Sequence, residues 1–433
     1  MNWDPYFQAI ARAELTKVVG KVVQIVGLVV EAQVQGVFIG ELCDIEVDAS
    51  RSIRSEVVGF KEEKVLLMPL GPMGGIRPGA PIYATGSPIR VKVGPQLLGR
   101  VLNGLGEPMD RKGDLPYEAL VDIDRDPPDP VQRPRIDRVL RVGVKAIDGI
   151  LTLGRGQRIG IFAGSGVGKS TLMGMLARNC EADVNVISLV GERGREVKDF
   201  IEESLGEDGL KRSVVVCATS DVPPVIRLKG AMVGTAIAEY FRDQGKNVLF
   251  MMDSVTRFAM AQREIGLATG EPPTTKGYTP SVFAMLPRLM ERAGTSEQGS
   301  ITAIYTVLVE GGDMDEPIAD AARGILDGHM VLSRDLAAKN HYPCIDIGHS
   351  VSRLFSVIAD PAHKKATGQL REILAKYIEA EDLINIGAYV RGSNPKIDQA
   401  IDKIDAINQF LRQGTDENVP FERTVQHLQS MFR

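Results

Sequence analysis

Residues 162–171, FAGSGVGKST, carry the clearest signal for the fold of the domain that contains them. An apolar strand pattern, IGIFA, ends at Ala163, and the helix pattern KSTLMGMLARNC follows Gly164, Gly166 and Gly168. Small residues between a strand and a helix let backbone N–H groups converge on phosphates at the positive end of the helix. The strict phosphate-loop pattern has glycine where this chain has Ala163. Alanine is acceptable there if φ is negative, so the stretch predicts a nucleotide triphosphate site.

The residues of this loop have separate expected roles. Lys169 is expected to reach the β- and γ-phosphates, and the Ser170 hydroxyl is expected to ligate Mg²⁺. Asp253 ends the apolar run NVLFMMDS, and a carboxylate at the carboxyl end of a central parallel strand favours a second contact to the Mg²⁺ site. The alternative for Asp253 is a helix cap, because a helical stretch follows it. The predicted nucleotide-binding residues of the loop are Gly164, Ser165, Gly166, Val167, Gly168, Lys169, Ser170 and Thr171.

Glu192 is the candidate for a catalytic base. It lies just past the strand pattern VNVISLV, whose end is expected to open onto the same crevice as the phosphate loop. A carboxylate there can orient and polarise the water that attacks the γ-phosphate, and Arg193 can bind phosphate or hold Glu192. The alternative is a solvated run of ion pairs formed by Glu192, Arg193, Arg195 and Glu196.

Patterns on either side of the loop divide the chain into four parts. Residues 20–88 show short strands separated by turns, which predicts a β-barrel. Residues 89–360 alternate strand and helix signals, which predicts an α/β domain built on a mainly parallel sheet. Residues 361–433 are amphipathic and helical throughout. In the segment 1–19, the apolar side chains of Trp3, Phe7 and Ile10 share one stripe of a short helix, with a frayed terminus as the alternative.

Bulk properties exclude several classes of protein. A chain of 433 residues requires more than one core, and its net charge of −5 argues against nucleic acid as the main partner. The four cysteines are scattered, which indicates a reducing compartment and neither a disulfide framework nor a zinc site. The sequence shows neither a signal peptide nor an apolar run of membrane-spanning length. We therefore expect a cytoplasmic protein that contacts a membrane only peripherally.

Matched blocks across nearly the whole chain resemble the hexameric RecA-type ATPase family of rotary ATP synthases and type III secretion. The blocks are LLGRVLNGLGEPMD (97–110), AGSGVGKST, VGERGREV, DSVTRFAMAQREIGLATGEPP (253–273) and YPCIDIGHSVSR (342–353). GERGREVKDFIEE and ATGEPPTTKGYTPSVFA are similar to the flagellar export ATPase and its virulence-secretion relatives. The resemblance implies a RecA-like P-loop domain between an N-terminal β-barrel and a C-terminal helical domain.

The resemblance also implies roles for individual residues. Glu192 matches the catalytic glutamate of the family, which makes this a hydrolytic subunit. Arg193 and Arg257 match active-site arginines. Tyr342 falls where the family stacks an aromatic ring on adenine, and Phe410 is expected on the other side of that pocket.

Two further positions stand out at the end of the matched region. Cys344 departs from the family signature, which usually has a small residue such as alanine there, and no functional change is expected because cysteine is compact. Arg353 matches the arginine finger, which the family supplies from the neighbouring subunit. One chain would then carry both halves of a site, so the resemblance implies a homohexamer in which Arg353 acts in trans.

The implied activity is Mg²⁺-dependent ATP hydrolysis that energises type III protein export, with the flagellar apparatus favoured. Implied partners are further copies of the chain, a peripheral stator protein that docks on residues 1–19, a central coiled-coil stalk subunit, the export gate, chaperones and secreted substrates. Residues 264–278 are predicted to form a mobile loop that faces the pore of the ring. The alternatives are the catalytic subunit of a proton-coupled rotary ATPase, the ATPase of a virulence secretion system, a ring motor on nucleic acid, and a scaffold that binds nucleotide without catalysis.

Overall fold

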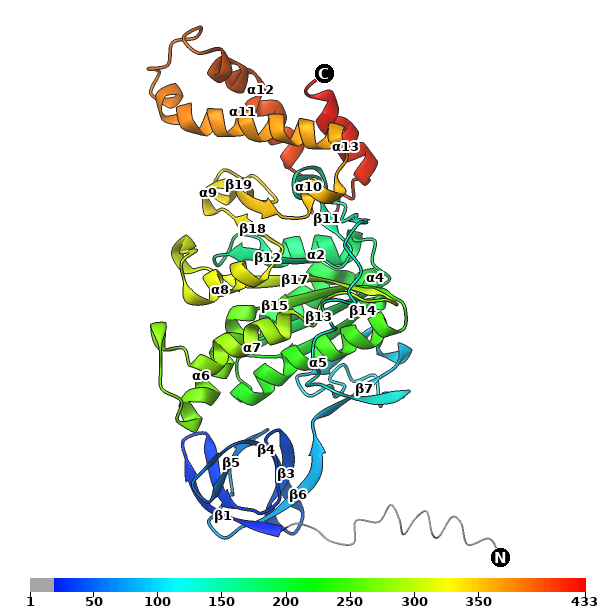
Figure 1. The fold of residues 1–433 in the computed structure, drawn as a ribbon, viewed down its shortest axis with the longest axis vertical. Coiled ribbons are helices and arrows are strands. Elements are labelled where there is room, and N and C mark those ends of the chain that lie inside the picture. Colours follow the sequence, from blue (N-terminus) through cyan, green and yellow to red (C-terminus); the bar gives the residue numbers. More distant parts are fainter. Residues whose placement is uncertain (1–18) are drawn as a thin grey trace, which may run out of the picture.

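Six short strands at the start of the described chain close into a barrel (Figure 1). The structure is a computed structural model that describes residues 19–433, so the predicted docking helix near the N-terminus lies outside the described residues. Along β3, alternate side chains such as Cys43 and Ile45 point into the barrel, which is the period of a half-buried strand. The strands, in the order in which they pair, are β1 (Val19–Val26), β2 (Val29–Gln33), β5 (Lys64–Pro69), β4 (Arg51–Lys61), β3 (Glu41–Asp48) and β6 (Pro81–Pro88).

A large, mainly parallel sheet forms the middle of the molecule. Its neighbouring strands pair in parallel, except that β19 runs antiparallel to β18 and β16 runs antiparallel to β17. The order across the sheet is β19 (Ile345–Ser352), β18 (Gly328–Leu332), β12 (Arg158–Ala163), β17 (Ser300–Leu308), β15 (Asn247–Asp253), β13 (Val184–Val190), β14 (Ser213–Ala218) and β8 (Arg100–Asn103), with β16 (Gly294–Thr295) beside β17. Because the parallel strands share one direction, β12, β13 and β15 end at the same edge of the sheet.

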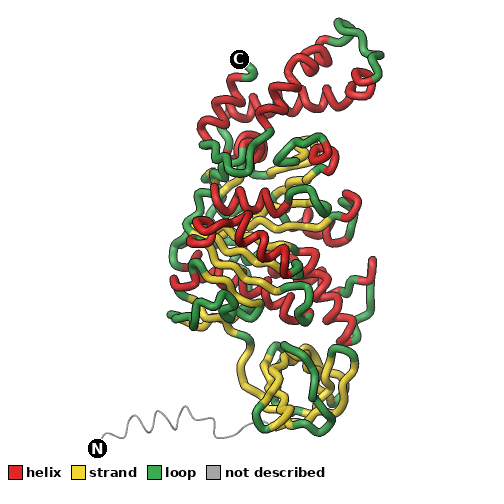
Figure 2. The backbone as a smooth tube through the Cα atoms, turned by 180° about the vertical axis from the view of Figure 1, so that it is seen from behind, coloured by secondary structure: helices red, strands yellow, loops and turns green. Residues whose placement is uncertain are grey.

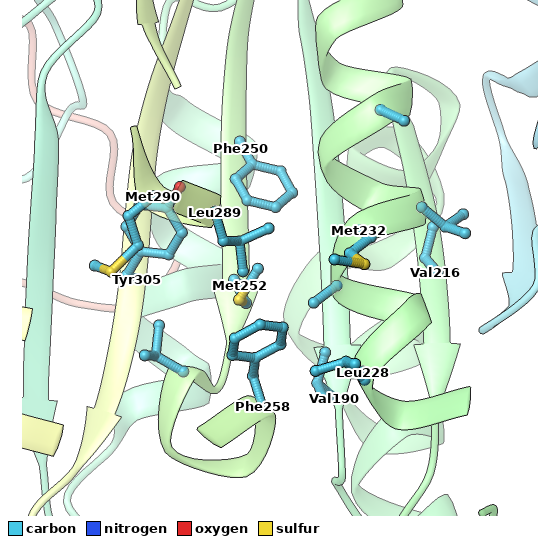
Figure 3. Close-up of a cluster of buried hydrophobic side chains, with 14 of the residues drawn as sticks. Val190, Val216, Leu228, Met232, Phe250, Met252, Phe258, Leu289, Met290 and Tyr305 are labelled. Carbon is cyan, nitrogen blue, oxygen red and sulfur yellow. The ribbon is translucent and has the colours of Figure 1, made fainter. Parts of the chain in front are cut away.

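Helices cover both faces of this sheet, so its strands are apolar on both sides. Along β13, Val186 and Val190 face one core, whereas Ile187 and Leu189 face the other. Figure 3 shows part of the first core, where Phe250 and other large side chains lie between the sheet and neighbouring helices. That core includes side chains of α5 (Pro224–Asp243), α6 (Val255–Thr269), α7 (Pro280–Met290) and α8 (Pro317–Ile325), and the opposite core includes those of α2 (Lys169–Asn179).

The remaining elements connect or flank this sheet. Helix α6 continues to Thr269, so the first residues of the predicted loop at 264–278 are helical. The short elements are β7 (Arg90–Val93), β9 (Ala119–Asp122), β10 (Val139–Leu140), β11 (Leu153–Gly154), α3 (Gly194–Asp199), α4 (Gly206–Lys211), α9 (Arg334–Ala338), α10 (Phe355–Ile358), three 3-10 turns (Pro95–Leu97, Thr275–Gly277, Glu310–Gly312) and two π-helical turns (Ile147–Leu151, Phe200–Leu205).

Three helices form the end of the molecule opposite the barrel: α11 (Pro361–Asn385), α12 (Pro395–Leu411) and α13 (Phe421–Ser430) (Figure 2). The Asp360 side chain caps α11 by accepting a hydrogen bond from the His363 backbone N–H. Within residues 19–433, no helix combines the length and apolarity needed to cross a membrane. The predicted fold, an α/β domain between a barrel and a helical domain, is confirmed.

Candidate active site

The phosphate loop lies between β12 and α2, as its sequence predicts. Ala163 is the last residue of β12, where it is fully buried and has no positive φ, so the missing first glycine leaves the strand intact. Gly166 and Gly168 have φ of 77° and 81°, a left-handed region that favours glycine. Helix α2 begins at Lys169, which directs its first unpaired N–H groups at the loop.

A cavity of about 610 Å³ opens above this loop. It brings together the loop, the residues after β13 and a side chain of α6. Its lining residues are Ala163, Gly164, Ser165, Gly166, Gly168, Lys169, Ser170, Thr171, Glu192, Arg193, Glu196, Arg257, Leu308, Val309 and Glu310. Of the predicted loop residues, only Val167 does not line it; its buried side chain belongs to the core beneath α2.

Lys169 connects two of the predicted site residues. Its ammonium Nζ lies 2.5 Å from Oδ1 of Asp253 and 3.7 Å from Oε1 of Glu192. The Thr306 hydroxyl, on β17, donates a second hydrogen bond of 2.7 Å to the same Asp253 oxygen. Asp253 does not cap α6, because the Ser254 side chain accepts the capping bond from the Arg257 backbone N–H. The helix-cap alternative for Asp253 is therefore wrong.

Glu192 lies in the cavity with a perturbed acidity. Burial, followed by the nearby charge of Asp253, raises the pKa of its carboxyl to about 7, and Lys169 acts in the opposite direction. A hydrogen bond with the Glu196 carboxyl adds to the rise in the pKa. The carboxyl groups of Glu192 and Asp253 thus lie beside the single ammonium of Lys169. A pKa of about 7 at Glu192 suits a group that accepts a proton from water near neutral pH.

The two arginines near this cavity differ in their surroundings. The Arg257 side chain packs against Gly191, and its Nε is buried without a hydrogen-bond partner among the described residues. The Arg193 side chain is largely exposed and pairs with Glu196 at 3.3 Å. The ion-pair alternative for this segment thus holds for Arg193 and Glu196, although both residues also line the cavity together with Glu192.

The donors at this site fit the magnesium ion expected with a triphosphate. The Ser170 residue lines the cavity and its hydroxyl forms no hydrogen bond with a described residue, and the buried Asp253 carboxylate is ion-paired with the preceding residue, Lys169. Mg²⁺ prefers oxygen ligands and takes only one or two from the protein when phosphates supply others.

A second cavity, of about 450 Å³, adjoins the first along Gly166, Gly168 and Thr171. Tyr342 lines it, and a methyl group on Gly168 would lie 3.7 Å from the Tyr342 ring. Gln413, Gly414 and Thr415 also line the cavity, and the sequence analysis identified none of these three. The cavity is adjacent to the phosphate loop and has an aromatic side chain, so it has the place and chemistry of a base pocket.

Phe410 does not line this cavity, and that prediction is wrong. Its ring is fully buried and stacks edge-to-face with His427 at a centroid distance of 5.3 Å. It also packs against Gly149, whose added methyl group would lie 3.0 Å from the ring. Ile407, Phe410 and Leu411 share the buried face of α12, so the helical period places the ring in the core.

Arg353 lies outside both cavities of its own chain. It directly follows β19, its side chain is exposed, and its guanidinium donates a 3.4 Å hydrogen bond to the Arg323 carbonyl. Cys344, in contrast, is buried at the base cavity, where its thiol donates a 2.8 Å hydrogen bond to the Val167 carbonyl of the phosphate loop. Within one chain, the predicted site residues therefore lie at or beside the two cavities, with the exception of Phe410 and Arg353.

Three family models match successive parts of the chain. The beta-barrel domain of the ATP synthase alpha/beta family matches residues 22–86, and the nucleotide-binding domain of that family matches residues 143–352. The T3SS EscN ATPase C-terminal domain matches residues 359–430.

Proteins from two kinds of secretion system resemble the chain over its length. The flagellum-specific ATP synthase of Bacillus subtilis (strain 168) is 55% identical over 433 residues, which is 100% of this chain and 99% of that protein. The type 3 secretion system ATPase of Xanthomonas euvesicatoria is 55% identical over 413 residues, 95% of this chain and 93% of that protein.

The solved structures agree with these matches. The assembled ATPase EscN from the enteropathogenic E. coli type III secretion system superposes with a TM-score of 0.91 at 45% identity, covering 95% of this chain and 99% of that one. EscN in complex with its central stalk EscO superposes with a TM-score of 0.88 at the same identity and coverage.

Proposed function

This chain belongs to the ATP synthase alpha/beta family, in the branch of flagellum-specific and type III secretion ATPases, and we propose how its residues hydrolyse ATP. The chain is an ATPase that drives type III protein export, in keeping with the relatives that resemble it over their full length. Export by the flagellar apparatus is favoured, because the flagellar relative covers the whole chain.

One observation carries the proposed mechanism: a buried carboxyl, Glu192, shares the phosphate-loop cavity with the Lys169 ammonium, 3.7 Å away. In our proposal, Lys169 leaves Asp253 for the β- and γ-phosphates, which brings a positive charge to the oxygens where negative charge develops. Glu192 then orients the attacking water and accepts its proton. Its raised pKa, near 7, matches the proton affinity of a base that works at neutral pH.

The remaining residues bind and orient the nucleotide. The N–H groups of residues 164–171 cradle the phosphates, and Arg257 contributes a guanidinium whose buried Nε has no hydrogen-bond partner in residues 19–433. Tyr342 stacks on the base. Ser170 and Asp253 would hold Mg²⁺, which would supply positive charge next to the phosphates.

The arginine finger comes from the neighbouring copy in this proposal. Arg353 is exposed and lines neither cavity of its own chain, as expected of a finger that acts in trans. The assembled form of EscN supports a ring of identical chains, which we propose to be a hexamer. A guanidinium at the transferring phosphoryl group accelerates hydrolysis by roughly 10³–10⁵-fold.

We further propose a cytoplasmic enzyme at the inner face of the cell membrane. The central stalk that accompanies EscN supports a coiled-coil stalk partner for this chain as well. A stator protein that docks on residues 1–19, the export gate, chaperones and secreted substrates complete the proposed set of partners.

Turnover of Mg-ATP per chain, measured against protein concentration, tests the proposal. A cooperative rise is expected, because each chain completes its neighbour's site, and chelation of Mg²⁺ should abolish it. A negligible rate at every concentration would contradict a self-sufficient homohexamer and favour a mixed rotary ring. Deleting the gene separates the two apparatuses, since loss of motility supports the flagellar role and loss of effector secretion with intact motility supports the virulence role.

A further inference from the structure

One wall of the base cavity belongs to the C-terminal helical domain. Residues 412–420, here called the α12–α13 connection, join those two helices, and their side facing the sheet supplies Gln413, Gly414 and Thr415 to the cavity. Tyr342 lines the same cavity from the segment before β19. A base in this cavity therefore contacts two domains at once.

Hydrogen bonds from Gln413 join this connection to the nucleotide-binding domain. The Gln413 backbone N–H donates to the Tyr342 carbonyl at 2.9 Å. Its side-chain Oε1 accepts from the Lys145 backbone N–H at 2.7 Å, and Nε2 donates to the carbonyls of Gly143 and Glu417 at 2.7 and 2.8 Å. The residue is only 6% exposed, and both amide N–H groups have carbonyl partners. Such a buried, fully used amide fixes the relative position of the segments that it joins.

Helix α2 holds the same connection at a second point. The Arg178 guanidinium, near the C-terminal end of α2, donates a 2.7 Å hydrogen bond to the Thr415 carbonyl. The other end of this helix is the phosphate loop. The connection is thus fixed both to the aromatic wall of the base cavity and to the helix that carries the loop.

We propose that Gln413 is a positioning residue that couples occupancy of the base cavity to the α12 and α13 helices. The inference rests on the proposed function, because it takes the ligand of this cavity to be the base of a nucleoside triphosphate. Gln413 sets the spacing between Tyr342 and the α12–α13 connection. A bound base stabilises that spacing, and displacement of the helices changes it, so base affinity and the position of the helices are thermodynamically linked.

The test compares a ligand that has a base with one that lacks it. Affinities of the full-length chain for Mg-ATP and for inorganic Mg-tripolyphosphate are measured by calorimetry for the wild type, Gln413→Glu and Gln413→Asn. The carboxylate of Gln413→Glu cannot donate hydrogen bonds to the carbonyls of Gly143 and Glu417. The shorter amide of Gln413→Asn cannot reach both carbonyls and the Lys145 N–H at once. We expect a roughly tenfold weaker affinity for ATP and an unchanged affinity for tripolyphosphate. The matched control is Gln426→Glu, on the exposed side of α13, which should leave both affinities unchanged.

Hydrogen exchange supplies a readout that a purely structural role would not move. In the wild type, ATP should slow exchange in α12 and α13 more than tripolyphosphate does, and this difference should disappear in the Gln413 variants. Equally weaker affinities for both ligands in the Gln413 variants, or no change in either affinity, would overturn the proposed coupling. Should the charged variant fail to fold, Gln413→Asn still decides the question. A wild-type chain that binds neither ligand would contradict the proposed function itself, which is a different outcome.

Discussion

The ammonium of Lys169 and the carboxylate of Asp253 form an ion pair of 2.5 Å that joins the first residue of α2 to the last residue of β15. The Glu192 carboxyl approaches the same ammonium from the end of β13. Three segments far apart in the sequence therefore bring their charges together at one edge of the sheet. Substitutions at this point are expected to separate nucleotide binding from hydrolysis.

Glu192→Gln should keep nucleotide binding and lose hydrolysis. The amide preserves the shape of the side chain but cannot accept the proton of the attacking water, so turnover should fall by roughly 10²–10⁴-fold. Phosphate release and the affinity for a fluorescent ATP analogue measure the two properties separately. Glu203→Gln, at an exposed position of the following helical segment, is the control and should retain wild-type turnover. Substantial hydrolysis by the Glu192 variant would remove this residue from the mechanism.

Arg353→Ala should bind ATP normally and lose turnover by roughly 10³-fold or more, because phosphoryl transfer would lack the guanidinium. Mixing this variant with Glu192→Gln tests whether the finger acts in trans. In rings formed from an equal mixture, a chain with an intact Glu192 meets a neighbour with an intact Arg353 at about a quarter of the interfaces. Partial activity should therefore return on mixing two inactive proteins. A mixture that stays inactive, despite demonstrated co-assembly, would assign the arginine to its own chain.

Tyr342→Ala should raise the KM for ATP by roughly tenfold and change kcat little, because a stacked ring binds the base equally in the ground and transition states. Tyr342→Phe keeps the ring and should behave like the wild type. Steady-state hydrolysis across ATP concentrations gives both parameters. A loss confined to kcat, in either variant, would contradict a base-binding role.

Lys229→Met should destabilise the junction between the barrel and the nucleotide-binding domain. Lys229, on α5, lies 2.5 Å from Glu56, on β4, and both side chains are almost fully buried. Removing the cation leaves a buried carboxylate without a partner, which costs about 3–5 kcal/mol. Urea unfolding should show this loss, and Glu56→Gln in the same chain should recover part of it. Lys211→Met, at an exposed lysine paired with Asp208, is the control.

The defect of Lys229→Met should depend on pH with a defined sign. Burial raises the pKa of Glu56 above its ordinary value, and Lys229 opposes that rise. A carboxyl whose pKa is higher in the folded state favours folding at low pH and loses that contribution as pH rises through the folded pKa. The gap in unfolding free energy between variant and wild type should therefore shrink as pH falls from 8 to 5. A gap that is constant over this range would contradict a charge-burial origin.

Much of the nucleotide-binding half of the site was predictable from the sequence because its signals are local. Gly166 and Gly168 lie in left-handed backbone conformations next to the start of a helix, and a loop of this kind needs few distant contacts to form. Glu192 and Asp253 follow apolar strands, and parallel strands must end at one edge of the sheet. Their convergence on Lys169 follows from that topology. The catalytic roles given to these residues stay predictions.

The base cavity was predictable only in part. Tyr342 lines it as expected, whereas Phe410 belongs to the core, because a helix buries the residues of one face whatever their chemistry. Gln413 carries no local signal, since its partners at Gly143, Lys145 and Tyr342 are distant in the sequence. A similar limit applies to Glu56 and Lys229, whose charges are separated by much of the chain.

The barrel, the parallel sheet, the phosphate loop and the carboxylates at the strand ends all follow from local patterns, since periodicity and turn chemistry act between neighbours along the chain. Which polar groups are buried together depends instead on how the domains pack. The tertiary structure pairs Lys169 with Asp253, places Phe410 in the core and gives the wall of the base cavity to Gln413. The physical reason is that a buried polar group must find its partner in space, and that partner is chosen by the packing of domains.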